Sequence, residues 1–318
     1  MALFWFQVTS LSRGQGRSAL AAAAYRAGER LRDEVRNAVY NHAGRRDVVH
    51  REILLPAARA ADAPDWVRDR NALWNAAERS ERRVDARVAR EFAVALPPEL
   101  DADRRTALAR AFAQHLADRY GTVVDLASHQ PRPAGDPRNF HAHLLATTRE
   151  LTPAGLGPKA SIELSDSSRA ARGLLRAGDE LRLLRADWAE RMNEALRTAG
   201  LDVTVDSRSL RAQGIDRIPK PHVPMAVVQM ERRGIATDVM RSLRASHPYY
   251  VHAAATERGA RDGGLDLDER AARARERWQA YRAALDDPMR AAEARRELEK
   301  GSARERGRER GHGIEFGD

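Results

Sequence analysis

Short apolar segments of strand length alternate with amphipathic segments of helical period along this chain, in no regular order. Strands are expected at residues 2–9, 48–55, 90–96, 122–128, 141–148 and 202–206. Helices are expected from Ser18 to about Arg32, at about 66–83, in a segment that Gly121 ends, and at roughly 169–199. A doubly wound parallel sheet needs a regular strand–helix–strand period, which is missing here. The pattern therefore predicts an α+β fold, with a mostly antiparallel central sheet flanked by helices.

The composition permits a nucleic-acid partner without requiring one. The 318 residues are 42% hydrophobic, enough for one large domain or two modest ones, and their net charge is +9. A basic chain of this kind suits a polyanion. However, lysine supplies only Lys159, Lys220 and Lys300, and an arginine bias of this size can arise from a GC-rich genome as readily as from phosphate recognition.

Several classes of site and location are excluded by what the sequence lacks. Cysteine is absent, which excludes disulfides, thiolate metal sites and cysteine nucleophiles. Neither a GxxxxGK[ST] phosphate loop nor a GxGxxG fingerprint is present, so no nucleotide cofactor is expected. No apolar run approaches the roughly 18 residues of a membrane span, and Met1 leads into a strand-like segment rather than a signal peptide. We therefore expect a cytoplasmic protein.

Three of the ten histidines form a pattern at the ends of two neighbouring strands. His141 and His143 lie two residues apart, so on a strand their imidazoles share one face. His129 ends the preceding strand, and a hairpin across residues 130–140 would bring it beside the other two. Three neutral imidazoles suit a divalent ion and leave positions open for substrate oxygens. The alternative is three unrelated histidines near a turn.

Glu91 and Tyr25 are two further candidates for chemistry. Glu91 shares a strand face with small alanines, where its carboxylate could reach a metal-bound water, a tyrosine hydroxyl or a histidine. Tyr25 lies among small residues on the first helix, so that a bulky ligand could approach it closely. Each has a purely structural alternative, an exposed strand glutamate and an aromatic helix anchor. The arginines near these motifs, and so the candidate DNA contacts, are Arg13, Arg17, Arg26, Arg90 and Arg149.

A phenol nucleophile, a histidine-bound metal and surrounding arginines together describe transesterification at a phosphodiester. The metal would bind the non-bridging oxygens and offset the charge of the transition state. Tyr25 would attack phosphorus in line and the 3′-hydroxyl would leave, giving a 5′-phosphotyrosine. Because this linkage keeps the phosphodiester energy, a returning 3′ end could reverse the cut.

Four blocks of the sequence resemble the MobA/MobL (MobQ-class) plasmid relaxases, in the same order and with similar separations. They are the opening block around AAAAYRAGE (residues 12–29), VAREFAVALP (88–97), NFHAHLLATTR (139–149) and the segment 210–234. The resemblance implies that Tyr25 is the nicking tyrosine, that His129, His141 and His143 hold the metal of an HUH-type relaxase fold, and that Glu91 is the acidic residue beside the site.

The resemblance also implies a substrate, partners and a domain division. The substrate would be single-stranded DNA at a plasmid origin of transfer, with Mg²⁺ or Mn²⁺ as the metal. Accessory relaxosome proteins and a conjugative coupling protein would be its partners in the bacterial cytoplasm. Residues 1–235 would form the relaxase domain, and residues 236–318 a charged helical extension with a disordered tail. The chain departs from the family in a longer loop between His129 and His141, and it shows no helicase or primase domain.

Three other functions compete with a relaxase. One is a rolling-circle replication initiator of the same superfamily, whose tyrosine more usually follows the histidine block, whereas Tyr25 precedes it. The others are a non-catalytic DNA-binding module and a metal-dependent hydrolase that uses a bound water. The tyrosines that could replace Tyr25 as nucleophile are Tyr120, Tyr249 and Tyr250.

Overall fold

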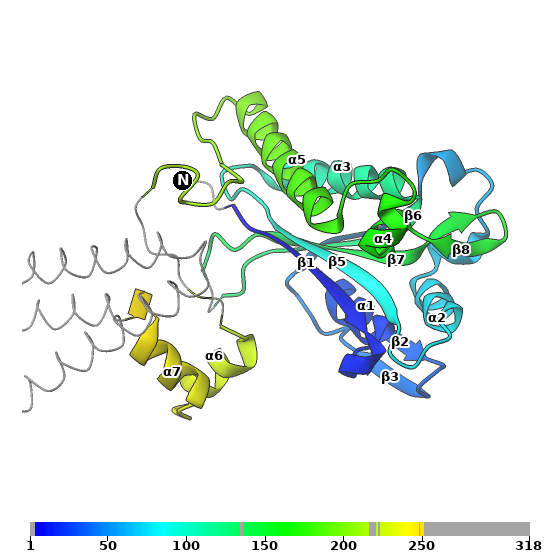
Figure 1. The fold of residues 1–318 in the computed structure, drawn as a ribbon, viewed down its shortest axis with the longest axis horizontal. Helices are drawn as coiled ribbons and strands as arrows, with labels where there is room; N and C mark the ends of the chain where they lie inside the picture. The colour runs from blue at the N-terminus through cyan, green and yellow to red at the C-terminus, as the bar shows by residue number, and fades with distance from the viewer. Residues whose placement is uncertain (1–3, 134–135, 216–220, 222, 248, 251–318) are drawn as a thin grey trace, which may run out of the picture. The chain divides into compact units, whose positions relative to one another are not determined.

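An antiparallel sheet forms the centre of the first part of the chain (Figure 1). The computed structural model describes residues 4–133, 136–215, 221, 223–247 and 249–250. The strands follow the order β1 (Phe6–Ser12), β5 (Arg87–Ala95), β7 (His141–Thr152), β6 (Thr122–His129) and β4 (Val48–Leu54), and β8 (Gly155–Lys159) pairs with β7. Every neighbouring pair is antiparallel, which confirms the expected fold class.

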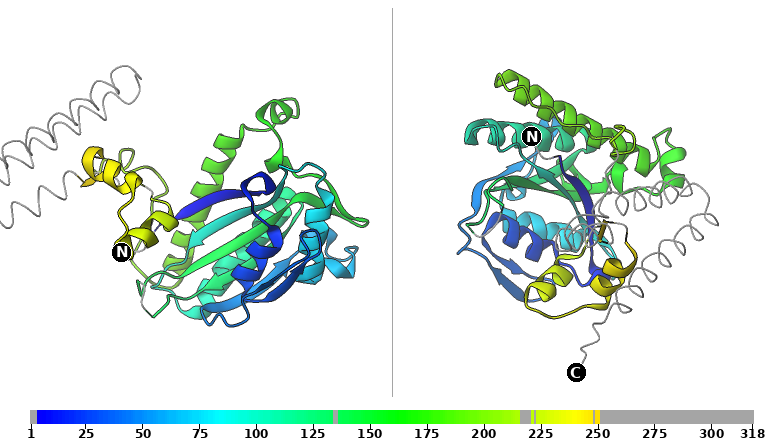
Figure 2. Two further views of the ribbon diagram at one scale, coloured as in Figure 1. Left: turned by 90° about the horizontal axis from the view of Figure 1, so that it is seen from below. Right: turned by 90° about the vertical axis from the view of Figure 1, so that its left-hand side faces the viewer.

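Helices cover both faces of this sheet, as the two views of Figure 2 show. α1 (Ala19–Ala27) and α2 (Arg70–Ser80) lie on one face, and the hairpin of β2 (Arg30–Asp33) and β3 (Ala38–Asn41) adjoins α1. α3 (Ala102–Tyr120) and α5 (Ala177–Thr198) lie on the other face, and the short α4 (Asp166–Ala170) precedes α5. Each face has its own hydrophobic core, so the sheet is buried between two layers.

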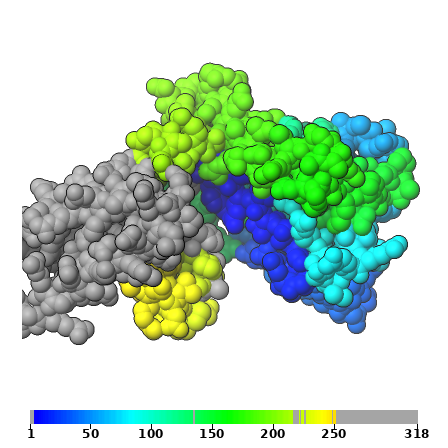
Figure 3. All heavy atoms as spheres, in the orientation of Figure 1, coloured from blue at the N-terminus to red at the C-terminus, as the bar shows by residue number. Residues whose placement is uncertain are grey.

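Strand β5 shows how the alternation of residue types assigns the two faces. Phe92 and Val94 are fully buried in the core with α3 and α5, as the period of two predicts. Glu91 and Ala93 point to the opposite face, toward α1. The edge strand β1, dark blue in Figure 3, reaches the surface of this unit beside β5. The Glu91 carboxylate therefore lies on the α1 side of the sheet, where it contacts His143.

The first helix is shorter than the expected span to about Arg32. Ser18 caps its start as predicted, since the Ser18 hydroxyl accepts a hydrogen bond from the Ala21 amide. The helix ends at Gly28, whose left-handed φ of 63° closes its last turn onto the Ala24 carbonyl. The following residues form β2 instead. Leu31, which suggested a longer helix, is buried on β2 instead. A buried apolar residue suits a helix and a strand equally, so it could not distinguish them.

Two further expectations differ from the structure. Residues 202–206 form no strand, because the Asn193 side chain binds both the amide and the carbonyl of Val205 and so replaces a strand neighbour. The helix expected over roughly 169–199 is divided into α4 and α5, with Gly173 in a left-handed conformation between them. The short strand β8 had no expected counterpart.

The chain divides into two compact units, residues 1–208 and 209–318. The second contains α6 (Met225–Arg232) and α7 (Asp238–Ser246), the latter capped by Thr237. The domain boundary expected after residue 235 stays a prediction, and most of the charged helical extension expected over residues 236–318, with its tail, lies outside the described residues. In the part of the chain that the structure describes, no helix has the length and apolar character needed to span a bilayer.

Candidate active site

Strand pairing brings three histidines together at one end of the sheet. β6 and β7 pair so that His129 faces His141, and His143 follows two residues later on the same face. The candidate ligand atoms of these histidines all lie within 4.8 Å of one another, and their ring centroids are 4.9–5.2 Å apart. The hairpin across residues 130–140 thus forms as expected, and it returns His129 to the other two histidines.

Hydrogen bonds to oxygen fix which nitrogen of each imidazole carries hydrogen. His129 Nε2 lies 2.7 Å from the Arg26 carbonyl oxygen, and His141 Nδ1 lies 2.9 Å from the Asn139 carbonyl oxygen. His143 Nδ1 lies 2.6 Å from Glu91 Oε1. Because all three partners are acceptors, these nitrogens donate, and each ring keeps a lone pair on its other nitrogen. Protein ligands of metals are typically held in this way.

Burial keeps two of these imidazoles neutral at neutral pH. His129 is fully buried at the end of β6, and burial lowers the pKa of its imidazole to about 3. Burial also lowers the pKa of His141. A neutral ring with a free lone pair can coordinate a cation without first losing a proton. The second nitrogen of each of the three rings could therefore coordinate a divalent metal ion.

Glu91 connects the histidine cluster to the first helix. Its carboxylate, 7% exposed, accepts from His143 Nδ1 and forms a two-pronged ion pair with the guanidinium of Arg26. Burial alone would raise the pKa of Glu91, but the hydrogen bonds from His143 and Arg26 hold it at about 2. Glu91 is thus ionised at neutral pH. It is also buried, so the alternative of an exposed strand glutamate is wrong.

Tyr25 stands on α1 immediately before Arg26, whose carbonyl contacts His129 and whose guanidinium binds Glu91. The Tyr25 side chain is 42% exposed, so it is not a buried anchor of the helix. Its hydroxyl accepts a hydrogen bond from Arg132 Nη2 at 3.1 Å. The ring packs edge-on against His42, and the guanidinium of Arg45 lies 4.2 Å from its centroid.

Sequence reasoning missed the polar residues that surround Tyr25. Asp47 binds the guanidinium groups of both Arg45 and Arg132. Arg45 and Asp47 directly precede β4, and Arg132 follows β6, so the pairing of these two strands brings the residues together. Nothing in the spacing of residues 45, 47 and 132 signals this contact. The sequence predicts the two strands, at residues 48–55 and 122–128, but it does not predict that they pair.

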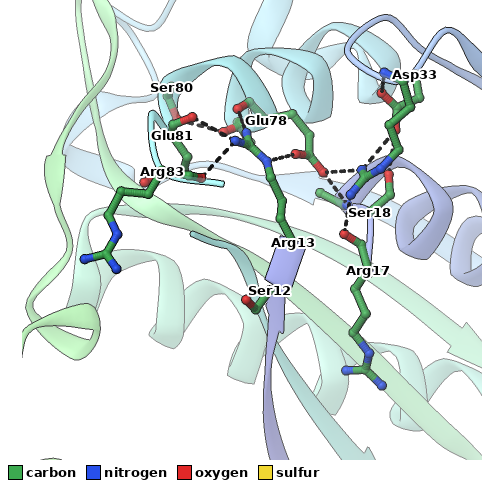
Figure 4. Close-up of polar contacts among 12 residues, drawn as sticks. Ser12, Arg13, Arg17, Ser18, Asp33, Glu78, Ser80, Glu81 and Arg83 are labelled. Carbon is green, nitrogen blue, oxygen red and sulfur yellow. Dashed lines mark hydrogen bonds and ion pairs between the residues drawn. The ribbon is translucent and has the colours of Figure 1, made fainter. Parts of the chain in front are cut away.

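The arginines proposed as DNA contacts are mostly bound to carboxylates inside the fold. Arg13 pairs with Glu78, Arg26 with Glu91, Arg90 with Glu163, and Arg149 with Glu81. Figure 4 shows Arg13 within its polar cluster, whereas the guanidinium of Arg17 points away from that cluster. DNA contact by any of these arginines stays a prediction.

One of the alternative nucleophiles is ruled out by its surroundings. Tyr120 is buried at the end of α3 and donates a hydrogen bond to Glu180 at 2.6 Å. Burial and the Glu180 carboxylate raise the pKa of its hydroxyl above the usual value. Tyr120 therefore has neither access to a substrate nor help in losing its proton. Tyr249 and Tyr250 belong to the second unit, where their rings contact each other.

Comparison with known proteins gives one consistent result. Residues 17–233 match the sequence model of the MobA/MobL family. Mobilization protein MobL of Acidithiobacillus ferridurans is 34% identical over 254 residues, which cover 73% of this chain and 65% of MobL. Conjugal transfer protein TraA of Rhizobium radiobacter is 33% identical over 264 residues, covering 76% of this chain and 23% of TraA. The chain thus spans under two thirds of the length of either relative.

A solved structure is also similar in fold. It comes from work on the molecular basis of vancomycin resistance transfer in Staphylococcus aureus. Its sequence is 30% identical to this chain, and the two structures superpose with a TM-score of 0.52. The match covers 65% of this chain and 100% of that chain.

Proposed function

Because the chain belongs to the MobA/MobL family, we propose that it is a mobilization relaxase. In this proposal it nicks one DNA strand at a plasmid origin of transfer, stays attached to the 5′ end, and rejoins the strand during conjugative transfer. The observation that carries the proposal is the link through Arg26. This residue follows the exposed Tyr25, and it contacts His129 through its carbonyl and Glu91 through its guanidinium.

The proposed metal ligands are the nitrogens that the hydrogen bonds leave free. These are Nε2 of both His141 and His143, and Nδ1 of His129, to which only a long contact of 3.4 Å from Arg45 Nη2 is made. The metal that we propose is Mg²⁺ or Mn²⁺, the ions that commonly handle phosphate oxygens, although three imidazoles by themselves suit Zn²⁺, Fe²⁺ or Ni²⁺ better than Mg²⁺. When bound, such an ion would withdraw negative charge from the non-bridging oxygens of a phosphodiester.

The residues of the chain supply the nucleophile and its placement. Tyr25 forms the bond to phosphorus and the 3′-oxygen leaves, so a phosphodiester is exchanged for a phosphotyrosine of similar energy and the step can run backwards. Glu91 fixes the tautomer and orientation of His143, and Arg26 holds that carboxylate in place. We propose single-stranded origin DNA as the substrate, and relaxosome proteins and a coupling protein as partners.

A covalent adduct assay tests this function. The protein is incubated with a supercoiled plasmid that carries its cognate origin, with and without EDTA, and then denatured. We expect a nicked circle with protein on the 5′ end, which is lost with EDTA and in Tyr25→Phe, because the phenol oxygen is the attacking atom.

The matched control is Tyr120→Phe, which removes a buried hydroxyl from the same unit. This variant should form the adduct as the wild type does. An adduct that persists in Tyr25→Phe would contradict the proposal. A nick without any adduct would indicate a hydrolase instead, and origin binding without nicking would indicate a DNA-binding module.

A further inference from the structure

The hydroxyl of Tyr25 has one side-chain partner among the residues that the structure describes. Arg132, in the loop that follows β6, donates from Nη2 to Tyr25 Oη at 3.1 Å. Arg132 thus approaches the nucleophile from the strand that carries His129, while Tyr25 itself lies on α1. A cation is therefore placed at the atom that gains or loses negative charge when the tyrosine reacts.

A carboxylate holds Arg132 in this position. Asp47, directly before β4, accepts from Arg132 Nε at 3.1 Å. The same carboxylate accepts from Arg45 Nε at 2.8 Å and from Arg45 Nη2 at 2.6 Å. The hydrogen bonds from Arg45 hold the pKa of Asp47 well below its usual value, so the charge of Asp47 persists. Two cations and one anion leave a net positive charge beside Tyr25.

The two arginines have different capacities for a further ligand. Arg45 is 12% exposed in its side chain, and it donates from Nη1 to the Tyr25 carbonyl at 2.6 Å besides its bonds to Asp47. Its donors are mostly used in holding the helix end. Arg132 is 62% exposed, and within the described residues its Nη1 has no hydrogen-bond partner. The unused edge of this guanidinium is open to a ligand that also touches Tyr25 Oη.

A guanidinium of this kind matches the chemistry of a phosphodiester. Its donors lie in one planar fork, and they can bind two oxygens at once where an ammonium acts as a point charge. In the transfer step the Tyr25 oxygen forms a bond to phosphorus, and the bond from phosphorus to the 3′-oxygen breaks. The phenol proton passes to solvent, and the 3′-oxygen takes up a proton. In the reverse step the phenolate is the leaving group, so a cation at Oη would assist both directions.

We propose that Arg132 is a catalytic residue that binds Tyr25 Oη and a non-bridging oxygen of the scissile phosphate together, with Asp47 as its positioning residue. This inference rests on the proposed function, since it requires Tyr25 to react with a phosphodiester. It adds to that function a protein cation at the scissile phosphate that is not itself a ligand of the proposed metal.

The test compares arginine variants in single-turnover nicking of an origin oligonucleotide, with the dissociation constant measured in parallel. We expect Arg132→Ala to nick more than about 100-fold more slowly, as removal of a transition-state donor does, with little change in DNA affinity. Arg132→Lys should recover part of the rate, because it restores the charge without the planar fork. The nicking rate of Asp47→Asn should fall by less than that of Arg132→Ala. The matched control is Arg138→Ala, from the same loop, whose exposed guanidinium pairs with Asp136.

A substrate with a neutral methylphosphonate at the scissile position separates a chemical role from a structural one. If Arg132 offsets the charge of a non-bridging oxygen, the loss of rate in Arg132→Ala should be much smaller on this substrate than on the phosphodiester, and what remains should reflect its contact with Tyr25 Oη. An equal loss on both substrates, or a loss of affinity that accounts for the whole effect, would overturn the inference. So would normal nicking by Arg132→Ala while Tyr25→Phe is inactive, a result that leaves the relaxase proposal intact. Absence of a Tyr25 adduct in the wild type would instead overturn the relaxase proposal.

Discussion

At the scale of single residues, the orientation of His143 depends on one carboxylate. We expect Glu91→Gln to weaken Mn²⁺ binding by about 10–100-fold, as loss of a partner behind a metal ligand typically does. Glutamine can still accept from His143 Nδ1, but it carries no charge to raise the basicity of the ring, and it leaves Arg26 without its counter-ion. Isothermal titration calorimetry with MnCl₂ measures the change directly, without any DNA.

The control for this variant is Glu163→Gln. Glu163 is likewise a buried carboxylate paired with an arginine, Arg90, but it touches no histidine. Both variants should lower the melting temperature, because each leaves a guanidinium without its partner. Only Glu91→Gln should lose metal affinity. Equal Mn²⁺ binding by the two variants would refute the role given to Glu91.

At the scale of elements, the placement of α1 depends on a carboxylate from α2. Glu78 is completely buried and accepts a hydrogen bond from the Ala19 amide at the start of α1, at 2.8 Å. It also pairs with Arg13, in the turn before the helix (Figure 4), and with Arg36, in the turn between β2 and β3. A negative charge at a helix N-terminus is favourable. The element that carries Tyr25 is therefore held by charge as well as by its alanine face.

Glu78→Gln should accordingly destabilise the protein by about 3 kcal/mol, since it leaves two arginines facing a buried neutral group. Urea unfolding followed by circular dichroism measures this loss. Glu34→Gln serves as the comparison, because its ion pair with Arg79 is half exposed and should be worth under about 1 kcal/mol. A cost for Glu78→Gln no larger than that for Glu34→Gln would show that the alanine face alone holds α1.

The elements also show which parts of the site the sequence could predict. The histidine cluster follows from local rules, because alternation places His141 and His143 on one face and a hairpin returns His129 to them. The contact between Arg132 and Asp47 depends on the register of β4 against β6, which joins residues far apart in the chain. No periodicity encodes that register. Likewise, residues 202–206 have the composition of a strand, and only the tertiary position of α5 explains why they form none.

At the scale of the whole first unit, buried acids paired with basic residues recur on both sides of the sheet. Glu81 binds Lys159 and Arg149 near β8, and Glu180 binds Arg119 between α5 and α3. Burial alone would raise the pKa of both carboxyls, but Lys159 lowers that of Glu81, and Arg119 lowers that of Glu180. Many of the arginines that make this chain basic are thus counter-ions within the fold.

This arrangement predicts acid lability with a definite sign. A carboxyl whose pKa is lower in the folded than in the unfolded state stabilises the fold above its unfolded value, about 4.3, and loses that contribution as the pH falls through the folded value. The free energy of unfolding should therefore fall as the pH is lowered from about 5 toward 3. Glu81→Gln should be less stable than wild type at pH 7, and the gap should narrow below about pH 4.5, because the wild type then loses the same charge. Urea unfolding of both proteins across this range measures the gap. A gap that stays constant from pH 7 to pH 3 would show that Glu81 stabilises the fold through its shape and hydrogen bonds, and that its charge contributes nothing.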